Sequence, residues 1–172
     1  MKLTAFIVPL LIATTVLGAE QPWRKIDEGF QFLVPPDWAQ SKVQGIDSHV
    51  GVYRGTSAYL EFDEVFGLGY TNEKGEKVID DLKRKEADTK LLKPGEEVWH
   101  VDGRIARFTF SKVDPKVFGQ RAYSNVASLF IPYDGRAGYL SVHLFYAGED
   151  YLPTVRRILK SFTWPRKSPT RR

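Results

Sequence analysis

Apolar and polar residues alternate in three short segments of the first half of the chain, and a period of two is typical of β-strands. The segments are residues 30–35, 48–54 and 58–66. Pro35 falls at the end of the first segment. Proline has no backbone N–H to donate within a sheet, so this residue predicts the end of that strand.

The period lengthens to that of an α-helix in residues 74–88 and again in residues 149–162. The first helix has a narrow apolar side made of Val78, Ile79 and Leu82. We therefore expect it to lie on a sheet with most of its surface in water. The second helix has a full apolar stripe made of Leu152, Val155, Ile158, Leu159 and Phe162. Asp150 is its predicted N-cap, and Pro153 falls in its first turn, where the missing N–H costs little.

Two further pairs of strands are predicted to join at Asp-Gly turns, at residues 102–103 and 134–135. Asp-Gly between apolar runs is a strong hairpin signal because both residues tolerate a positive φ. A two-residue loop fixes the pairing of the strands on either side of it. In the first hairpin this pairing places Trp99 opposite Ala106.

The second hairpin has one mainly apolar face. If Asp134 and Gly135 form its loop, Leu129 lies opposite Leu140. The apolar face then consists of Ala127, Leu129, Leu140, Val142 and Leu144. A slip by one residue would turn every one of these side chains to the other face. This face needs an apolar partner, and we expect the C-terminal helix to supply it.

Most of the predicted connections are hairpins, and hairpins join antiparallel strands. The predicted fold is therefore α+β, with a largely antiparallel sheet of about seven strands flanked by helices. No repeat and no long linker divides the chain. We expect a single domain over residues 20–164.

The N-terminal residues have the plan of a secretory signal peptide. Lys2 precedes an apolar run over residues 3–17, and the small residues Gly18 and Ala19 follow. We expect residues 1–19 to be a signal peptide cut after Gly18 or Ala19, and the mature protein to be exported to the periplasm or secreted. The apolar run is shorter than a membrane span, and no later segment is apolar enough to cross a membrane.

The net charge of +4 comes from the two ends of the chain. Lys2 belongs to the predicted signal peptide, and four basic residues fall in the segment 165–172, which we expect to be a disordered basic tail. The predicted domain itself has a charge of about −1, so nucleic acid is not an expected partner. The chain has no cysteine, which excludes thiol chemistry and favours a bacterial envelope over a eukaryotic secretory origin.

The sequence contains none of the common catalytic motifs, such as G-x-S-x-G or H-E-x-x-H. We therefore predict no catalytic, cofactor-binding or metal-binding residues. One alternative remains, because Glu61 and Asp63 alternate along a predicted strand and so point to the same face, about 7 Å apart. Together with a histidine, these carboxylates would suit a small hydrolase or a metal-dependent enzyme. The histidines are His49, His100 and His143, and Asp47 is a second potential metal ligand beside the first of them.

Aromatic residues make up 13% of the chain, more than the core of one sheet needs. Four side chains fall on the face of the second hairpin opposite its predicted core face: Phe130, Tyr139, His143 and Phe145. An aromatic and partly polar face favours the binding of a partner. We predict this face as a binding surface for a protein or for a component of the envelope surface.

Two segments at the ends of the domain have a familiar form. Residues 30–38 contain the pattern F-x-x-P-x-x-W, and residues 158–162 read Ile-Leu-Lys-Ser-Phe. In both segments the chain resembles the PsbP/Mog-like fold group, which includes the extrinsic P protein of photosystem II and many bacterial exported proteins. The resemblance implies an antiparallel sheet sandwiched by helices, and a binding or accessory module without a cofactor. The predicted function is that of an exported, non-enzymatic binding or accessory protein of the cell envelope.

Overall fold

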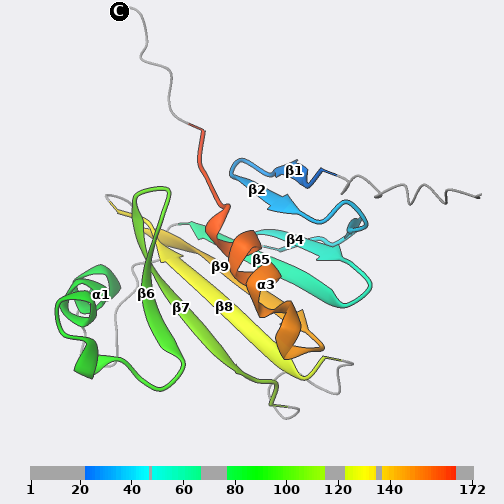
Figure 1. The fold of residues 1–172 in the computed structure, drawn as a ribbon. Coiled ribbons are helices and arrows are strands. Elements are labelled where there is room, and N and C mark those ends of the chain that lie inside the picture. The colour runs from blue at the N-terminus through cyan, green and yellow to red at the C-terminus, as the bar shows by residue number, and fades with distance from the viewer. Residues whose placement is uncertain (1–21, 47, 67–76, 115–122, 135–136, 166–172) are drawn as a thin grey trace, which may run out of the picture.

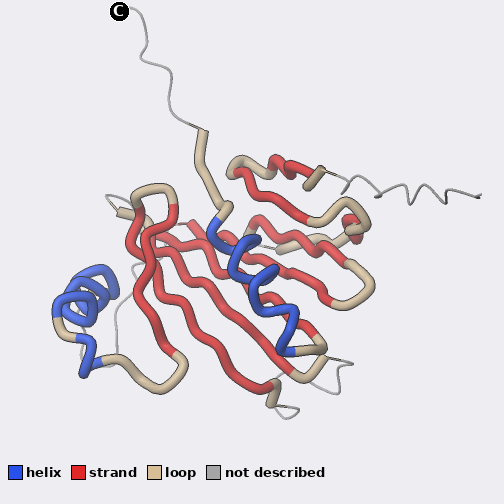
Figure 2. Tube along the Cα trace, in the orientation of Figure 1, coloured by secondary structure: helices blue, strands red, loops and turns tan. Residues whose placement is uncertain are grey.

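Figures 1 and 2 show the computed structural model, which describes residues 22–46, 48–66, 77–114, 123–134 and 137–165. The predicted signal peptide and residues 166–172 of the predicted tail lie outside the described residues. Within the described part of the chain, no helix is long and apolar enough to cross a membrane.

A seven-stranded sheet forms the centre of the fold, and every pair of neighbouring strands in it is antiparallel. In spatial order, the strands are β3 (Ala39–Ser41), β4 (His49–Arg54), β5 (Ala58–Phe66), β9 (Gly138–Tyr146), β8 (Asn125–Pro132), β7 (Arg104–Lys112) and β6 (Glu96–Val101). In the described part of the chain, the helices are α1 (Val78–Ala87), α3 (Leu152–Lys160) and the short 3₁₀ turns η1 (Thr89–Leu91) and η2 (Glu149–Tyr151). The predicted α+β fold with a largely antiparallel sheet of about seven strands is confirmed.

The strand predicted at residues 30–35 does not belong to this sheet. It is β2 (Gln31–Val34), which pairs with β1 (Arg24–Asp27) in a separate hairpin. The alternation of residues could not show this, because any strand with one buried face has the same pattern. The apolar side of β2 packs down onto the sheet and the C-terminal helix, and the ring of Phe32 stacks on that of Phe162 with centroids 4.7 Å apart.

The face of the sheet that α3 and the β1–β2 hairpin cover is called the inner face below (Figure 1). The five residues predicted to form the apolar face of the second hairpin are all 0% exposed on it: Ala127, Leu129, Leu140, Val142 and Leu144. Val155, Ile158 and Leu159 of α3 and the following Phe162 belong to the same core. The predicted packing of the C-terminal helix on this face is confirmed.

The first hairpin has the predicted register, with Trp99 opposite Ala106. Its loop residues, Asp102 and Gly103, have φ angles of 49° and 76°, as a two-residue turn of this type requires.

The second hairpin differs from the prediction by two residues, since Leu129 lies opposite Val142 rather than Leu140. Tyr133 donates its N–H to the carbonyl of Gly138, so the loop is longer than Asp134 and Gly135 alone. Gly138 has a φ of 137°, and a Cβ at this position would collide with the carbonyl oxygen of Val65 on β5. Packing against the neighbouring strand therefore decided where β9 starts. A shift by two residues keeps every side chain on its face, so the residue pattern alone could not detect it.

Helix α1 packs on the opposite face of the sheet, which is called the outer face below. Its residues Val78 and Leu82 are buried against Phe130 of β8. The ammonium of Lys85 lies 2.9 Å from a carboxylate oxygen of Glu96, which ties the helix to β6. Because α1 contacts β6 and β7, the described helices leave the outer face of β4 and β5 uncovered.

Helix α3 begins at Leu152, one residue later than the predicted N-cap implies. Asp150 lies in the 3₁₀ turn η2, and Tyr151 is the N-cap of α3 without a side-chain hydrogen bond to the helix. The predicted N-cap was therefore wrong, because the 3₁₀ turn already supplies the hydrogen bond at the start of the helix, from the N–H of Leu152 to the carbonyl of Glu149. Pro153 falls in the first turn as predicted.

Candidate functional site

An open groove of about 580 Å³ crosses the outer face of the sheet beside α1. It is called the outer-face groove below. The residues that line it come from the segment before β4 and from five strands: Val43, Val50, Gly51, Val52, Glu61, Phe62, Asp63, Arg107, Phe130, Tyr139, Ser141 and His143. A site of this volume and mixed lining fits a small molecule or a side chain of a partner.

The register between β5 and β9 brings the acidic residues to a histidine. Glu61 lies directly opposite His143, and Asp63 lies opposite Ser141. Directly opposed residues on one face of antiparallel strands have Cβ atoms about 5 Å apart. The structure therefore brings together the two carboxylates and one histidine of the alternative prediction. The other two histidines lie elsewhere, His49 on the inner face and His100 beside α1.

His143 is held between two serine hydroxyl groups. The Oγ of Ser128 lies 2.8 Å from Nδ1 of His143, and the Oγ of Ser141 lies 3.3 Å from Nε2. A hydroxyl group can donate or accept, so either tautomer of the neutral ring is satisfied. The imidazole is thus oriented by β8 and by its own strand.

The two carboxyl groups of the groove are only partly exposed to water. Burial raises the pKa of Glu61 above its usual value, and the nearby guanidinium of Arg54 opposes this shift without cancelling it. One carboxylate oxygen of Asp63, Oδ1, is buried and has no hydrogen-bond partner among the described residues. Among the described residues, the hydrogen-bonding need of this buried oxygen of Asp63 is therefore unmet.

Three of the four predicted partner-binding residues line this groove. The rings of Phe130 and Tyr139 lie 5.0 Å apart, and the third residue is His143. Phe145 does not line it, because its side chain is 0% exposed and stacks on Tyr59 at 4.7 Å. It supports the sheet in a small core of its own and has no surface to offer a partner, so its prediction as a contact residue was wrong.

The alternative prediction included a metal-dependent enzyme, which needs several metal ligands close together. Among the described residues, no group of three histidine and acidic side chains is arranged to hold a metal ion. Asp47, the potential ligand beside His49, lies outside the described residues.

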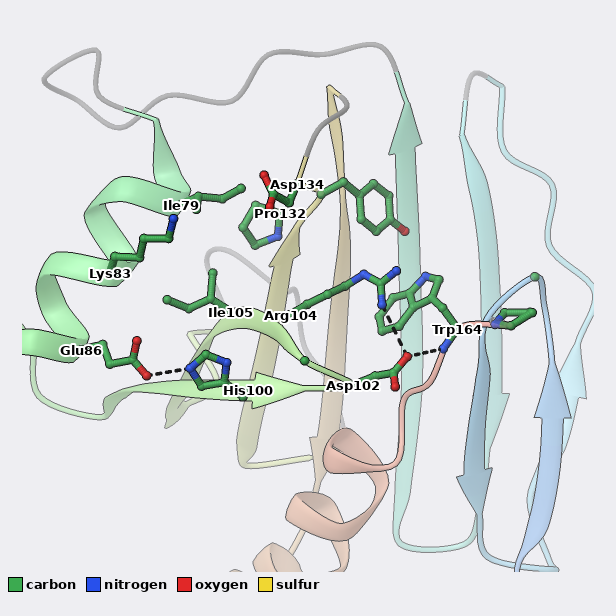
Figure 3. A pocket seen from close by; sticks show the side chains of 14 residues that line it. Ile79, Lys83, Glu86, His100, Asp102, Arg104, Ile105, Pro132, Asp134 and Trp164 are labelled. Carbon is green, nitrogen blue, oxygen red and sulfur yellow. Dashed lines mark hydrogen bonds and ion pairs between the residues drawn. The ribbon is translucent and has the colours of Figure 1, made fainter. Parts of the chain in front are cut away.

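A larger cleft of about 1020 Å³ lies at one end of the sheet, between α1, the β6–β7 turn and the C-terminal segment (Figure 3). Its charged groups are mostly paired with one another. His100 lies 2.6 Å from Glu86, and Asp102 accepts the backbone N–H of Trp164 at 2.9 Å. The guanidinium of Arg104 lies 4.1 Å above the indole ring of Trp164. These contacts fasten the C-terminal segment and α1 to the β6–β7 hairpin, so we assign this cleft to the fold.

A third polar cluster, partly buried, lies between the β1–β2 turn and the inner face, and it was not predicted from the sequence. His49 lies 3.2 Å from Glu64 and 3.3 Å from Glu28. Tyr133 donates its hydroxyl hydrogen to Glu64, and Tyr53 donates to Glu28. Glu64 is 6% exposed. An available sign was that Glu64 follows Leu60 and Phe62 at a spacing of two, which places a carboxylate on the apolar face of a strand.

Comparison with known proteins identifies the fold and leaves the function open. No family model matches the chain, and no curated protein matches it. A crystal structure from Bacteroides thetaiotaomicron VPI-5482 is similar, with a TM-score of 0.50 and 7% sequence identity over 83% of this chain and 48% of that one. The chain thus spans about half the length of that protein. At this identity the similarity concerns the fold alone, and the resemblance to the PsbP/Mog-like group stays a prediction.

Proposed function

We propose that this protein is an exported, non-enzymatic binding or accessory protein of the cell envelope, and that the outer-face groove is its binding site. The observation that carries this proposal is the groove itself. It brings Phe130, on which helix α1 packs, together with Tyr139 and His143 in an open groove beside that helix. Aromatic side chains beside polar groups are the usual composition of a binding surface.

The binding role is tested by capture from an envelope extract of the organism that makes the protein. The full mature chain is the bait, with Tyr139→Ala as the groove variant and Lys90→Ala, on the exposed turn η1, as the matched control. We expect a specific partner that the wild-type chain and the control retain and the groove variant loses. A partner retained equally by all three chains, or no specific partner, would contradict the proposal.

Export is tested separately by cell fractionation and N-terminal sequencing. We expect the protein in the periplasm or the medium, starting at Ala19 or Glu20. A cytoplasmic protein that keeps residues 1–19 would contradict the envelope location and leave the groove proposal untouched.

A second candidate function is hydrolysis, because the structure brings Glu61, Asp63 and His143 together. Burial raises the pKa of Glu61, which is the property of a general acid, and Asp63 lies about 7 Å away on the same strand face. Carboxyl groups at such a separation suit the hydrolysis of glycosides with a water molecule between them. Chromogenic glycosides and esters test this function. Turnover by the wild-type chain that Glu61→Gln reduces by at least about a hundredfold would favour it over the binding role.

A further inference from the structure

We propose that the layer formed by α3 and the β1–β2 hairpin is a second interaction surface, and that its partner is a membrane surface rich in anionic lipid headgroups. This layer covers the inner face of the sheet, on the side opposite the outer-face groove (Figure 1). The basic surface, as it is called below, consists of Trp23, Lys25, Arg157, Lys160 and Trp164. The inference goes beyond the proposed function, because it concerns a different surface of the molecule.

Helix α3 presents charges of one sign to solvent. From its middle onward it contains Arg156, Arg157 and Lys160, and it has no acidic residue. Arg157 and Lys160 are exposed. The acidic residues before the helix, Glu149 and Asp150, lie at its other end. Helix α1, by contrast, has as many acidic as basic residues, so α3 differs from α1 in its net positive charge.

The two exposed cations of α3 lie on tryptophan rings instead of carboxylates. The guanidinium of Arg157 lies 3.9 Å from the centre of the Trp23 ring, and the ammonium of Lys160 lies 4.9 Å from that of Trp99. Neither cation has an ion pair with any residue that the structure describes. An aromatic ring attracts a cation without cancelling its charge. Both positive charges therefore stay available to an anionic partner.

The β1–β2 hairpin continues the basic surface beside α3. Trp23 and Lys25 are two residues apart, and side chains at this spacing point to the same side of an extended chain. Since Trp23 lies against Arg157, the exposed Lys25 is on the side of the hairpin that contacts α3. Asp27 is the acid at the next such position, and its carboxylate accepts a hydrogen bond from the amide of Gln31. The two cations of α3 and Lys25 outnumber this acid.

Two further acids beside the basic surface are paired with cations. Arg156 makes two hydrogen bonds to Glu97. Asp102 accepts the backbone N–H of Trp164 and lies 3.5 Å from the guanidinium of Arg104, which stacks on the Trp164 ring (Figure 3). In the described part of the chain, the basic surface therefore has a surplus of positive charge.

The sequence adds more positive charge at the end of this surface. Four basic residues and no acidic one follow Pro165, namely Arg166, Lys167, Arg171 and Arg172. Chain connectivity keeps these charges within a few residues of Trp164. Clusters of about four to eight Lys and Arg residues bind membranes that contain anionic lipids. The described cations and this segment together reach that number.

The tryptophan residues favour a bilayer over a soluble polyanion as the partner. The indole ring is amphipathic and prefers the boundary between water and lipid. Trp23 and Trp164 are both only partly buried. A soluble polyanion would use the charges alone, whereas a bilayer would also use these rings. Attachment through the basic surface leaves the outer-face groove, on the opposite face of the sheet, open to water.

Sedimentation with lipid vesicles tests the proposal. The mature chain is mixed with vesicles of phosphatidylcholine that contain about 30% phosphatidylglycerol, and with vesicles of phosphatidylcholine alone. We expect binding to the anionic vesicles only, and loss of most of it at about 0.5 M NaCl, since salt screens exposed charges. Equal binding to the neutral vesicles, or no binding, would overturn the inference. Binding to heparin but not to the vesicles would also overturn it, because the partner would then be a soluble polyanion.

The double variant Arg157→Gln with Lys160→Gln removes two charges from the basic surface. We expect it to weaken the Kd for the anionic vesicles by about tenfold or more. The matched control, Lys83→Gln with Lys90→Gln, removes two exposed charges on and next to α1 and should leave the Kd almost unchanged. Equal losses for the two double variants would assign the binding to net charge and not to this surface. If circular dichroism shows that the first double variant does not fold, Lys25→Gln takes its place, with an expected loss of about fivefold.

Two further variants separate this inference from its alternatives. Glutamine at all four basic positions after Pro165 should weaken vesicle binding without abolishing it. If that change abolishes binding while Arg157→Gln with Lys160→Gln binds as well as the wild-type chain, the basic surface is not the binding surface. Tyr139→Ala changes the groove and should bind vesicles as the wild-type chain does. Vesicle binding without a captured partner would remove the groove proposal and leave the membrane surface, and a captured partner without vesicle binding would do the reverse.

Discussion

The two faces of the central sheet use the same strands for different purposes. On the inner face, the side chains of β8 and β9 that face α3 are almost all apolar and 0% exposed. On the outer face of the same strands, Ser141 and His143 line a groove open to solvent, and Ser128 contacts the ring of His143. Successive side chains of a strand point to opposite faces, so each strand contributes alternately to the core and to the groove.

The inner and outer faces differ in how well they tolerate substitutions. The inner face is close-packed, and its side chains contact α3 and the β1–β2 hairpin, so a change of charge there affects the whole core. The groove residues contact solvent on one side, so their substitution changes local chemistry first. The inner face therefore sets stability, and the described helices leave the outer face of β4 and β5 uncovered.

The largest expected effect comes from placing a charge on the inner face. Val142→Asp buries an unpaired carboxylate at a position that is 0% exposed, and it should cost more than about 4 kcal/mol, enough to unfold most of the protein. His143→Asp, one residue away on the outer face, should cost roughly 1 kcal/mol. Urea denaturation followed by circular dichroism measures both. Similar losses for the two variants would break the distinction between the faces.

The polar cluster of Glu64, Glu28 and His49 is an exception to the apolar inner face, and it should be sensitive as well. Tyr133→Phe removes a hydrogen bond to the buried carboxylate of Glu64 and should cost about 1–3 kcal/mol. In a Glu64→Gln background the same substitution should cost much less, because the charged acceptor is gone. A full cost in both backgrounds would show that the hydroxyl group acts through something other than Glu64.

A smaller effect is expected at the edge of the inner face, where Arg156 of α3 makes two hydrogen bonds to Glu97, at 3.0 Å and 2.6 Å. These bonds hold the pKa of Glu97 below its usual value, against burial, and the indole N–H of Trp99 adds to them. Both side chains are at least a third exposed, so Glu97→Gln should cost only about 0.5–1 kcal/mol at pH 7.

The contribution of the Glu97 carboxylate to stability depends on pH, because its pKa is lower in the folded state than in the unfolded state. A lowered pKa in the folded state stabilises the fold above the unfolded value of 4.5, and the gain is lost as the pH falls through the folded-state pKa. Denaturation curves of the wild-type chain and Glu97→Gln should therefore converge in acid. A difference that persists at low pH would assign the effect to packing.

The smallest expected effect is a gain in stability on the outer face. Burial raises the pKa of Glu61 in the folded state, so its contribution to stability decreases as the pH rises above 4.5. Glu61→Gln should therefore stabilise the protein by about 0.5 kcal/mol at pH 7 and by less in acid. A loss of stability at pH 7 would mean that Glu61 is part of the fold.

The sequence predicted the faces of strands better than their positions in the sheet. It predicted which residues of β8 and β9 face the core, since that depends only on a period of two. It did not predict that β2 leaves the main sheet or that β9 starts at Gly138, because both depend on contacts with β4, β5 and α3.

For the candidate site, too, the sequence predicted the faces of the residues better than their positions relative to one another. That Glu61 and Asp63 share a face, and that Tyr139 and His143 lie opposite the core, could be read from alternation alone. Alternation could not predict that these residues meet in one groove. The strands β5 and β9 are separated by more than seventy residues of sequence and become neighbours only in the sheet. The burial of Phe145 was missed for the same reason, because Tyr59 of β5 covers it.

By itself, the sequence determined the local period of each segment, the turn at Asp102 and Gly103, and the side of each strand that is apolar. These properties depend on residues close together along the chain. The tertiary structure decided the order of the strands, the register at the second turn, and the meeting of two carboxylates with a histidine beside aromatic rings. These depend on pairing between distant strands, where several arrangements bury the same apolar residues and only the packing of the whole core selects one.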